Sequence, residues 1–339
     1  MKLLVCGGAG FIGSNFIRYI LNKHHDWDVV NFDKLTYAGN SLNLKDFGSD
    51  ARYKLVRGDI ADQDAVDRAV EQSKPEALIS FAAETHVDRS IHGSLKDFIS
   101  ANVMGPQVLC EATKKYKVPL FIQVSTDEVF GALRLDEKRL FHEETPFAPN
   151  MPYAACKAGG DLVCRSYFQT FKTPVIVTHC SNNYGPYQFP EKFIPQTIFK
   201  AMADEAIPIY GDGLYVRDWI HAIDHASAIE LLLQKGVPGE VYNIGADNER
   251  SNLEVVRMLL TMLGKSESLM SHVQDRPGHD RRYAIDSAKI MRMGWIPEYP
   301  REKFEAGLRK TVEWYQENTE WVEALRTRKQ DMNPHIKTG

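Results

Sequence analysis

The sequence predicts an α/β protein: a Rossmann-type, doubly wound parallel sheet with a smaller mixed α/β lobe for a substrate. Short apolar strands alternate with helices through the first half of the chain. A glycine-rich turn follows the first of these strands, and an acidic residue ends the second. We expect residues 1–180, with returning segments near 217–245, to form the dinucleotide-binding domain, and residues 181–330 to form mainly the second lobe.

Composition narrows the class of partner. The 339 residues are 43% apolar and 25% charged, with a net charge of −4, which argues against a nucleic-acid groove or an anionic membrane surface. No apolar stretch approaches the ~20 residues of a membrane helix, and the N-terminus lacks the apolar core of a signal peptide. The five cysteines are odd in number and lie mostly in apolar patterns, so we expect a cytoplasmic protein without disulfides.

The first strand–turn–helix unit predicts a dinucleotide site. Residues 2–6 form an apolar strand, glycines follow at positions 7, 10 and 13, and residues 11–21 repeat apolar side chains at helical spacing. Glycines let the backbone approach a pyrophosphate at the helix N-terminus. The next strand, residues 28–32, ends at Asp33, whose carboxylate would accept hydrogen bonds from a ribose and repel a 2′-phosphate. NAD is therefore favoured over NADP.

The alternation continues toward the middle of the chain. We expect strands at 53–57 and 77–81 and helices at 64–71 and 99–116. Ligands bind beyond the carboxyl ends of parallel strands, so Asp59, Ala82 and Ala83 should wall the dinucleotide. Two interpretations remain open for the polar residues that follow the strand at 77–81, a capping network or direct contact with substrate: His86, Asp88 and Arg89.

An acid–base apparatus is predicted after the buried strand at 120–124. Tyr153 and Lys157 lie four residues apart on one face of a helix, where an ammonium group favours the phenolate. Such a tyrosine can take a proton from a hydroxyl while NAD takes hydride from the same carbon. The alternative is a surface aromatic beside a solvated lysine.

The adjacent carboxylates Asp127 and Glu128 predict an elimination. Neighbours in a strand point to opposite faces, so both reach one ligand only if the strand ends, which we expect at residues 124–125. Two neighbouring carboxyls repel, so one stays protonated while the other ionises. This pair could protonate a departing hydroxyl and remove a C–H proton made acidic by a neighbouring ketone. The alternative is a capping Asp and a solvated Glu.

The second half of the chain is less regular. A strand is expected at 174–178, a looser region of short helices and loops at 186–210, a returning α/β pattern at 217–233 and 241–245, and helices at 252–264 and 303–318. Scattered basic and amide side chains in this half suggest anchors for a diphosphate-linked substrate: Lys192, Arg217, Arg276, Arg281, Asn182, Asn183 and Asn252.

These motifs together resemble a known family. The glycine turn, Ala82-Ala83-Glu84, Tyr153 with Lys157, and Asn182-Asn183-Tyr184-Gly185-Pro186 resemble the extended short-chain dehydrogenases/reductases. Thr126-Asp127-Glu128, Tyr210-Gly211-Asp212-Gly213 and residues 275–283 narrow the resemblance to the dTDP-glucose 4,6-dehydratases, from Lys2 to about Trp321. Sugar epimerases of the superfamily lack the carboxylate pair, and NADP-using GDP-mannose dehydratases lack the Asp.

The resemblance implies a mechanism. Tyr153, helped by Lys157 and Thr126, would deprotonate the glucose 4-hydroxyl as hydride leaves C4 for NAD, while Glu128 takes the C5 proton and Asp127 protonates the departing 6-hydroxyl. Hydride returns at C6, so NAD is regenerated and stays tightly bound. The family consists of homodimers with an NAD lobe and a nucleotide-sugar lobe, and it uses no metal.

The resemblance also implies two sets of binding residues. Those for NAD are Gly7, Gly10, Phe11, Ile12, Gly13, Asp33, Lys34, Thr36, Asp59, Ile60, Phe81, Ala82, Ala83, Thr85, Ser100, Tyr153, Lys157 and Asn183. Those for the substrate are Thr85, Thr126, Asn182, Lys192, Pro208, Tyr210, Arg217, Asn252, Arg276 and His279.

Four positions depart from the family pattern near these sites: Cys6, Met151, Cys156 and His179. None removes a group that the chemistry uses. Three alternatives remain: a dehydratase for a UDP-linked sugar, a nucleotide-sugar 4-epimerase, and a dinucleotide sensor without catalysis. A sensor would be expected to lose Tyr153, Lys157 or the carboxylates, and all four are present.

Overall fold

Seven parallel strands form the central sheet of the computed structural model, which describes residues 1–275 and 277–326. The strand order changes direction between β1 and β4, so the connecting helices on either side of that point lie on opposite faces of the sheet. This is the predicted doubly wound Rossmann-type sheet. In spatial order the strands are β10 (Val241–Ile244), β6 (Val175–Cys180), β5 (Phe121–Thr126), β4 (Ala77–Ser80), β1 (Lys2–Cys6), β2 (Asp28–Asp33) and β3 (Tyr53–Arg57).

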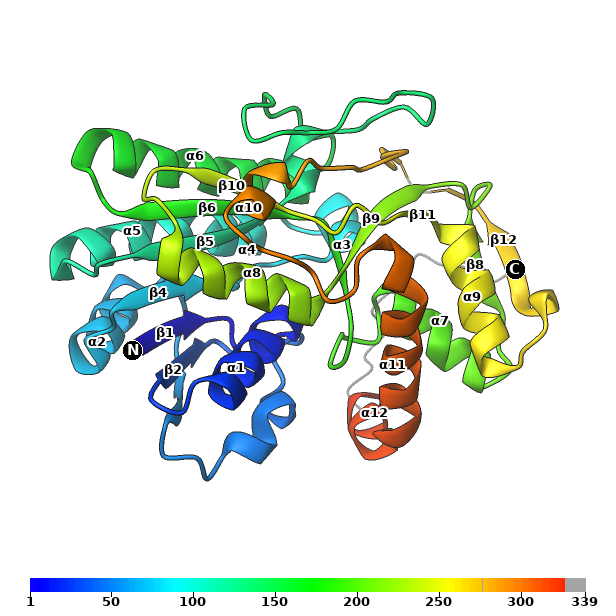
Figure 1. Ribbon diagram of the computed structural model, residues 1–339, viewed down its shortest axis with the longest axis horizontal. Coiled ribbons are helices and arrows are strands. Elements are labelled where there is room, and N and C mark those ends of the chain that lie inside the picture. The colour runs from blue at the N-terminus through cyan, green and yellow to red at the C-terminus, as the bar shows by residue number, and fades with distance from the viewer. Residues whose placement is uncertain (276, 327–339) are drawn as a thin grey trace.

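Helices cover both faces of this sheet (Figure 1). On β1, Leu3 and Val5 point into a core shared with α1 (Phe11–Lys23) and α8 (Ala222–Lys235). Leu4 and Cys6 point into the opposite core, shared with α2 (Gln63–Ser73), α5 (Gly105–Tyr116) and α6 (Pro152–Phe171). Because both faces are buried, most of the central strands are continuous apolar runs rather than alternating ones.

The helix predicted over 99–116 is present, but it contains a π-helical turn that the sequence did not indicate. The structure has α4 (Lys96–Ile99), a π-helical segment η2 (Ser100–Met104), and then α5. In η2, the Asn102 side chain bonds the backbone nitrogen of Glu84 at 3.0 Å and its carbonyl oxygen at 2.9 Å. The widened turn therefore secures the chain that leaves β4, a tertiary contact that helical periodicity does not report.

The segment 186–210, expected as short helices and loops, contains α7 (Phe193–Met202) and β8 (Ile207–Tyr210). Pro195 is the third residue of α7, where no intrahelical donor is required, so it does not break the helix. β8 pairs in parallel with β12 (Met270–Val273), and paired residues such as Ile207 and Met270 are 63 positions apart. With α9 (Asn252–Leu263), α11 (Phe304–Glu317) and α12 (Thr319–Arg326), these elements form the lobe on the right in Figure 1.

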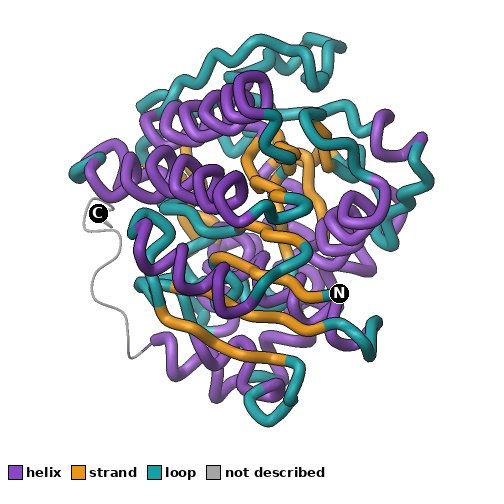
Figure 2. Tube along the Cα trace, turned by 90° about the vertical axis from the view of Figure 1, so that its left-hand side faces the viewer, coloured by secondary structure: helices purple, strands orange, loops and turns teal. Residues whose placement is uncertain are grey.

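A small three-stranded sheet and the strand β10 connect this lobe to the central sheet. β9 (Val216–His221) lies between β7 (Asn182–Tyr184) and β11 (Glu249–Ser251) in a three-stranded sheet, whereas β10 returns to the central sheet beside β6. The remaining helices are the short α3 (Val87–His92) and α10 (Ala288–Arg292). Figure 2 shows the same chain turned by 90°, with its helices, strands and loops in different colours. The division at residue 180 stays a proposal. None of the helices in the described ranges is long and apolar enough to cross a membrane.

Candidate active site

Two adjoining cavities lie beyond the carboxyl ends of the sheet strands. The larger has a volume of about 1020 Å³ and the smaller about 410 Å³. They share part of their walls, including Gly7, Gly10, Phe81 and Ala83 from the ends of β1 and β4. Parallel strands deliver their ends to one edge, which is why residues distant in sequence meet here.

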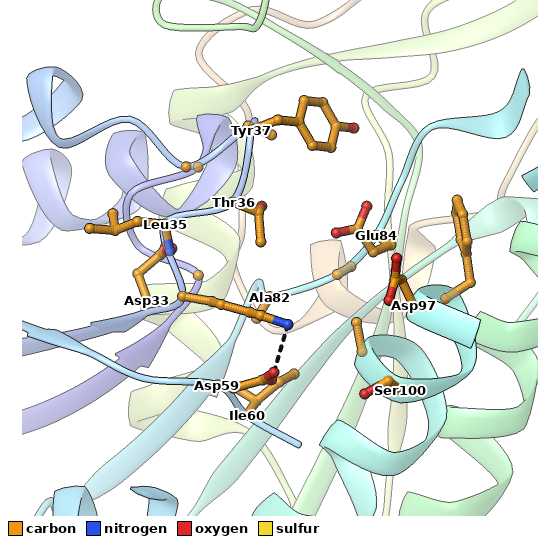
Figure 3. Close-up of a pocket in the computed structure, with 18 of the residues that line it drawn as sticks. Asp33, Leu35, Thr36, Tyr37, Asp59, Ile60, Ala82, Glu84, Asp97 and Ser100 are labelled. Carbon is orange, nitrogen blue, oxygen red and sulfur yellow. Dashed lines mark hydrogen bonds and ion pairs between the residues drawn. The ribbon is translucent and has the colours of Figure 1, made fainter. Parts of the chain in front are cut away.

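The larger cavity is lined by many of the residues predicted to bind a dinucleotide (Figure 3). The glycine turn permits a close approach to β4: Gly7 has a φ of +76°, and a Cβ there would lie 2.5 Å from the Ala82 backbone nitrogen. A Cβ at Gly13 would lie 2.4 Å from the Gly7 carbonyl oxygen. The predicted cofactor residues along this cavity are Gly7, Gly10, Asp33, Lys34, Thr36, Asp59, Ile60, Phe81, Ala82, Ala83 and Ser100.

Asp33 ends β2 at the wall of this cavity. Its two carboxylate oxygens accept from the Ala9 nitrogen at 2.9 Å and the Leu35 nitrogen at 2.7 Å, which fixes the carboxylate beside the glycine turn. Burial raises its pKa. Lys34 forms an ion pair with Asp59 at 2.7 Å, drawn as the dashed line in Figure 3. Side chains at Gly7 or Gly13 would clash with neighbouring backbone atoms, so the glycines keep the turn compact. Together with the fixed carboxylate of Asp33, this turn fits a dinucleotide with a free ribose hydroxyl.

The smaller cavity collects the predicted catalytic and substrate residues. Tyr153 and Lys157 from α6 line it together with Thr126 and Glu128 from the end of β5. Arg276 lies outside the described residues. Every other predicted substrate residue lines the same cavity: Thr85, Thr126, Asn182, Lys192, Pro208, Tyr210, Arg217, Asn252 and His279. The remaining predicted cofactor residues do too: Phe11, Ile12, Gly13, Thr85, Tyr153, Lys157 and Asn183.

Tyr153 and Lys157 are both almost fully buried. The Lys157 ammonium donates to the Val124 carbonyl oxygen at 2.8 Å. Burial raises the pKa of Tyr153 well above its ordinary value, and Glu128 raises it further. Desolvation and neighbouring carboxylates therefore oppose the phenolate that Lys157 is expected to favour.

The carboxylate pair sits on a turn, but later than expected. β5 runs through Thr126, and the 3₁₀ turn η3 (Asp127–Phe130) begins there rather than at residues 124–125. The Thr126 hydroxyl starts this turn by accepting from the Glu128 nitrogen at 3.3 Å. Breaking the strand at this point lets two neighbouring carboxyls avoid the opposite-face rule of a regular strand.

The two carboxyls differ in environment. Glu128 lines the smaller cavity, while Asp127 is 1% exposed and does not line either cavity. Burial, followed by the charge of Glu128, raises the pKa of Asp127 well above 3.8. The environments of the two carboxyls therefore favour a proton on Asp127 over one on Glu128.

Two cationic side chains that follow β6 in the sequence, Lys192 and Arg217, line the smaller cavity. Arg217 donates to the Asp280 carbonyl oxygen at 3.0 Å, and its guanidinium lies 4.3 Å from the Tyr283 ring centre. The Lys192 ammonium donates to the Thr85 carbonyl oxygen at 3.0 Å, joining the two lobes. Packing holds these cations in place beside the cavity, a geometry suited to an anionic ligand.

Three residues of the site were not singled out from sequence. Tyr283 lines the smaller cavity, Glu191 accepts from the Tyr37 hydroxyl at 3.2 Å, and Asp161 lies buried behind Lys157. Asp161 follows Lys157 by four residues, and that spacing on one helix face was an available signal. His86 caps α3 by accepting from the Arg89 nitrogen at 3.3 Å, which is the capping interpretation.

Comparisons with known proteins agree with this geometry. The family described as GDP-mannose 4,6 dehydratase matches residues 4–311. A dTDP-glucose 4,6-dehydratase of Escherichia coli is 47% identical, with 96% of each chain covered. The dTDP-glucose 4,6-dehydratase of Bacillus anthracis, solved with NAD, is 46% identical with a TM-score of 0.88, covering 96% of this chain and 99% of that one. That of Streptomyces venezuelae, also solved with NAD, is 44% identical with a TM-score of 0.91, covering 96% and 100%.

Replacing Gly7 by alanine should remove bound dinucleotide. The new Cβ would meet the Ala82 backbone at a backbone angle that alanine adopts only with strain, so we expect the glycine turn to shift and the protein to lose about 1–3 kcal/mol. NAD released from the denatured, purified protein measures the effect. Gly264→Ala is the matched control, since it has a φ of +65° and no atom within 4 Å of its Cβ. Full NAD content in Gly7→Ala would contradict the assignment.

Proposed function

Because the chain belongs to the dTDP-glucose 4,6-dehydratases, within the family described as GDP-mannose 4,6 dehydratase, we propose that it converts dTDP-glucose to dTDP-4-keto-6-deoxyglucose and water. It is an NAD-dependent hydro-lyase of deoxysugar biosynthesis. The observation that carries the proposal is one cavity lined by Tyr153, Lys157 and Glu128, with the buried Asp127, whose pKa is raised, adjoining in sequence.

Tyr153 is the proposed base for the 4-hydroxyl. Bound NAD supplies a reversible hydride acceptor and a positive charge to the site. Positive charge in this cavity, including that of Lys157, favours the phenolate and opposes the effect of burial on the pKa of Tyr153. A phenolate formed in a buried site is a strong base, so it can take the hydroxyl proton as C4 becomes a ketone.

Asp127 and Glu128 are the proposed acid and base of the elimination. Burial raises the pKa of Asp127 and so favours its protonated form, which could donate a proton to the departing 6-hydroxyl. Glu128 faces the cavity and can accept the C5 proton once the C4 ketone makes it acidic. The difference in burial between these adjacent residues supports the two proposed roles. An epimerase, which only oxidises and reduces C4, has no use for this pair.

The second lobe is proposed to hold the nucleotide diphosphate. Arg217 and Lys192 supply positive charge, Asn182 and Asn252 supply neutral hydrogen bonds, and His279 stacks on Tyr215 with ring centres 3.6 Å apart. Arg276 is part of the same proposal on the grounds of sequence alone. The proposed division into two lobes at residue 180 has the same basis, because most of the proposed substrate-binding residues come after β6, which ends at Cys180.

The substrate is tested by incubating the purified protein with dTDP-glucose and, separately, with UDP-glucose. We expect the alkaline absorbance of a 4-keto sugar from dTDP-glucose and a much lower rate from UDP-glucose. Equal rates would replace the thymidine assignment by a broader nucleotide specificity. No keto product from either substrate, with NAD bound, would refute the proposed activity.

Two variants should separate oxidation from elimination. Tyr153→Phe removes the first base and is expected to abolish the transient NADH absorbance and slow turnover by about 10²–10⁴-fold. Asp127→Asn keeps the shape of a neutral side chain without an acidic proton, so NADH should form and persist while 6-deoxy product falls by a similar factor. Stopped-flow absorbance and product analysis measure the two steps.

Glu128→Gln completes this set. It should block incorporation of solvent deuterium at C5, because no base remains for that proton. Normal NADH formation in Tyr153→Phe, or normal C5 labelling in Glu128→Gln, would show that the corresponding role is misassigned.

The protein is further proposed to be a cytoplasmic homodimer. All five cysteines are free and buried, which suits a reducing compartment. Two large apolar side chains on the outer face formed by η2 and α6, Met104 and Leu162, are 51% and 55% exposed, and a second copy would cover them.

Light scattering should therefore give twice the chain mass. The double variant Met104→Glu with Leu162→Glu should give the single-chain mass, because charges would be buried at the interface. Ile296→Glu is the control, since this equally apolar residue is 84% exposed elsewhere on the surface. A dimer that survives the double variant would place the interface on another face.

A further inference from the structure

Asp161 is a buried acid that the proposed mechanism leaves without a role. It lies on α6, four residues after Lys157 and eight after Tyr153, so all three share one face of the helix. The side chain is almost fully enclosed. A carboxylate in such a place destabilises the fold unless its oxygens have partners, so its contacts are informative.

One carboxylate oxygen of Asp161 binds two neighbouring strands. Oδ2 accepts from the Ser125 hydroxyl at 2.6 Å and faces Nε2 of His179 at 3.2 Å. Ser125 on β5 and His179 on β6 are cross-strand partners, so Asp161 ties α6 to both strands at one register position. The His179 ring is held in turn by the edges of Phe130 and Phe147, at 4.8 and 5.6 Å between ring centres.

This contact joins the two halves of the proposed chemistry. Ser125 immediately precedes Thr126-Asp127-Glu128, while α6 carries Tyr153 and Lys157. We propose that Asp161 is a positioning residue that fixes the elimination turn against the oxidation helix and keeps the positive charge on Lys157. The inference deepens the proposed function and rests on it.

The charge of Asp161 acts on a crowded buried site. Burial lowers the pKa of Lys157, and Asp161 is the first of the groups that oppose this, followed by Cys180 on β6 and Cys164 on α6. Around Tyr153 the acidic neighbours are Glu128, Cys180, Asp127 and Asp161. Since Asp161 is among the groups acting on both members, the Tyr153–Lys157 pair titrates in its field.

Removing that charge has two separable effects. The Tyr153–Lys157 pair would lose its first proton at lower pH, because less negative charge would remain nearby to hold that proton. The remaining proton would then rest more often on Tyr153, because Asp161 is first among the groups that favour protonated Lys157 and last among those that favour protonated Tyr153. The active form, with an ionised Tyr153 and a protonated Lys157, would become scarcer. A purely structural defect lowers the rate without moving the pH at which it rises.

The test is the pH dependence of transient NADH formation in Asp161→Asn holoenzyme mixed with dTDP-glucose. We expect the acid limb to move to lower pH by about one unit, and the plateau rate to fall by up to about tenfold. Asp224→Asn is the matched control, a buried acid on α8 that accepts from the backbone nitrogens of Glu298 and Tyr299. It should leave the limb in place.

Ser125→Ala separates the effect of the Ser125–Asp161 hydrogen bond from the effect of the Asp161 charge. It also keeps the inference testable if Asp161→Asn does not fold. It removes one hydrogen bond and leaves the carboxylate, so NADH formation and C5 deuterium incorporation should both slow while the acid limb stays unmoved. An unmoved limb in folded Asp161→Asn, or wild-type rates in Ser125→Ala, would overturn the inference. Absence of NADH in the wild-type enzyme would instead refute the proposed function.

Discussion

Parallel pairing of β1, β4, β5 and β6 is the constraint on which the site depends. Each of these strands ends at the same edge of the sheet, and each contributes a different component there: the glycine turn, the Ala82 wall, the carboxylate turn and the Asn182 segment. None of these segments could reach the others by local structure. The close approach of Gly7 to Ala82 shows how tightly the register is used, since a single methyl group would not fit between them.

Burial then decides the protonation of each group. Asp127 and Glu128 are identical in charge and adjacent in sequence, yet desolvation makes one an acid while the other faces the cavity. The same desolvation raises the pKa of Tyr153 and lowers that of Lys157, so burial favours the neutral form of both groups. A phenolate beside an ammonium group therefore costs more in this buried site than in water, unless other positive charge in the site stabilises it.

Much of this was available from the sequence because the signals were local. The strand at 2–6, the glycines at 7, 10 and 13, and the spacing of Tyr153 and Lys157 are short-range patterns set by backbone geometry. The pairing of β8 with β12 and the π-helical turn at Asn102 depend on contacts far apart in the chain, which periodicity does not encode. The effect of burial on the pKa of Tyr153 was missed for a related reason: spacing locates Lys157, but it does not report how much water surrounds the phenol.

The return of β10 to the central sheet has a consequence for how the chain folds. β6 is synthesised some sixty residues before its outer partner, so its edge stays unpaired until the chain has passed through α7, β8 and β9. Unpaired strand edges are templates for association with other chains. Early folding intermediates should therefore be prone to aggregation. The central sheet is completed only after the chain of the second lobe has been synthesised. Truncation at residue 180 would remove β10 and expose the edge of β6.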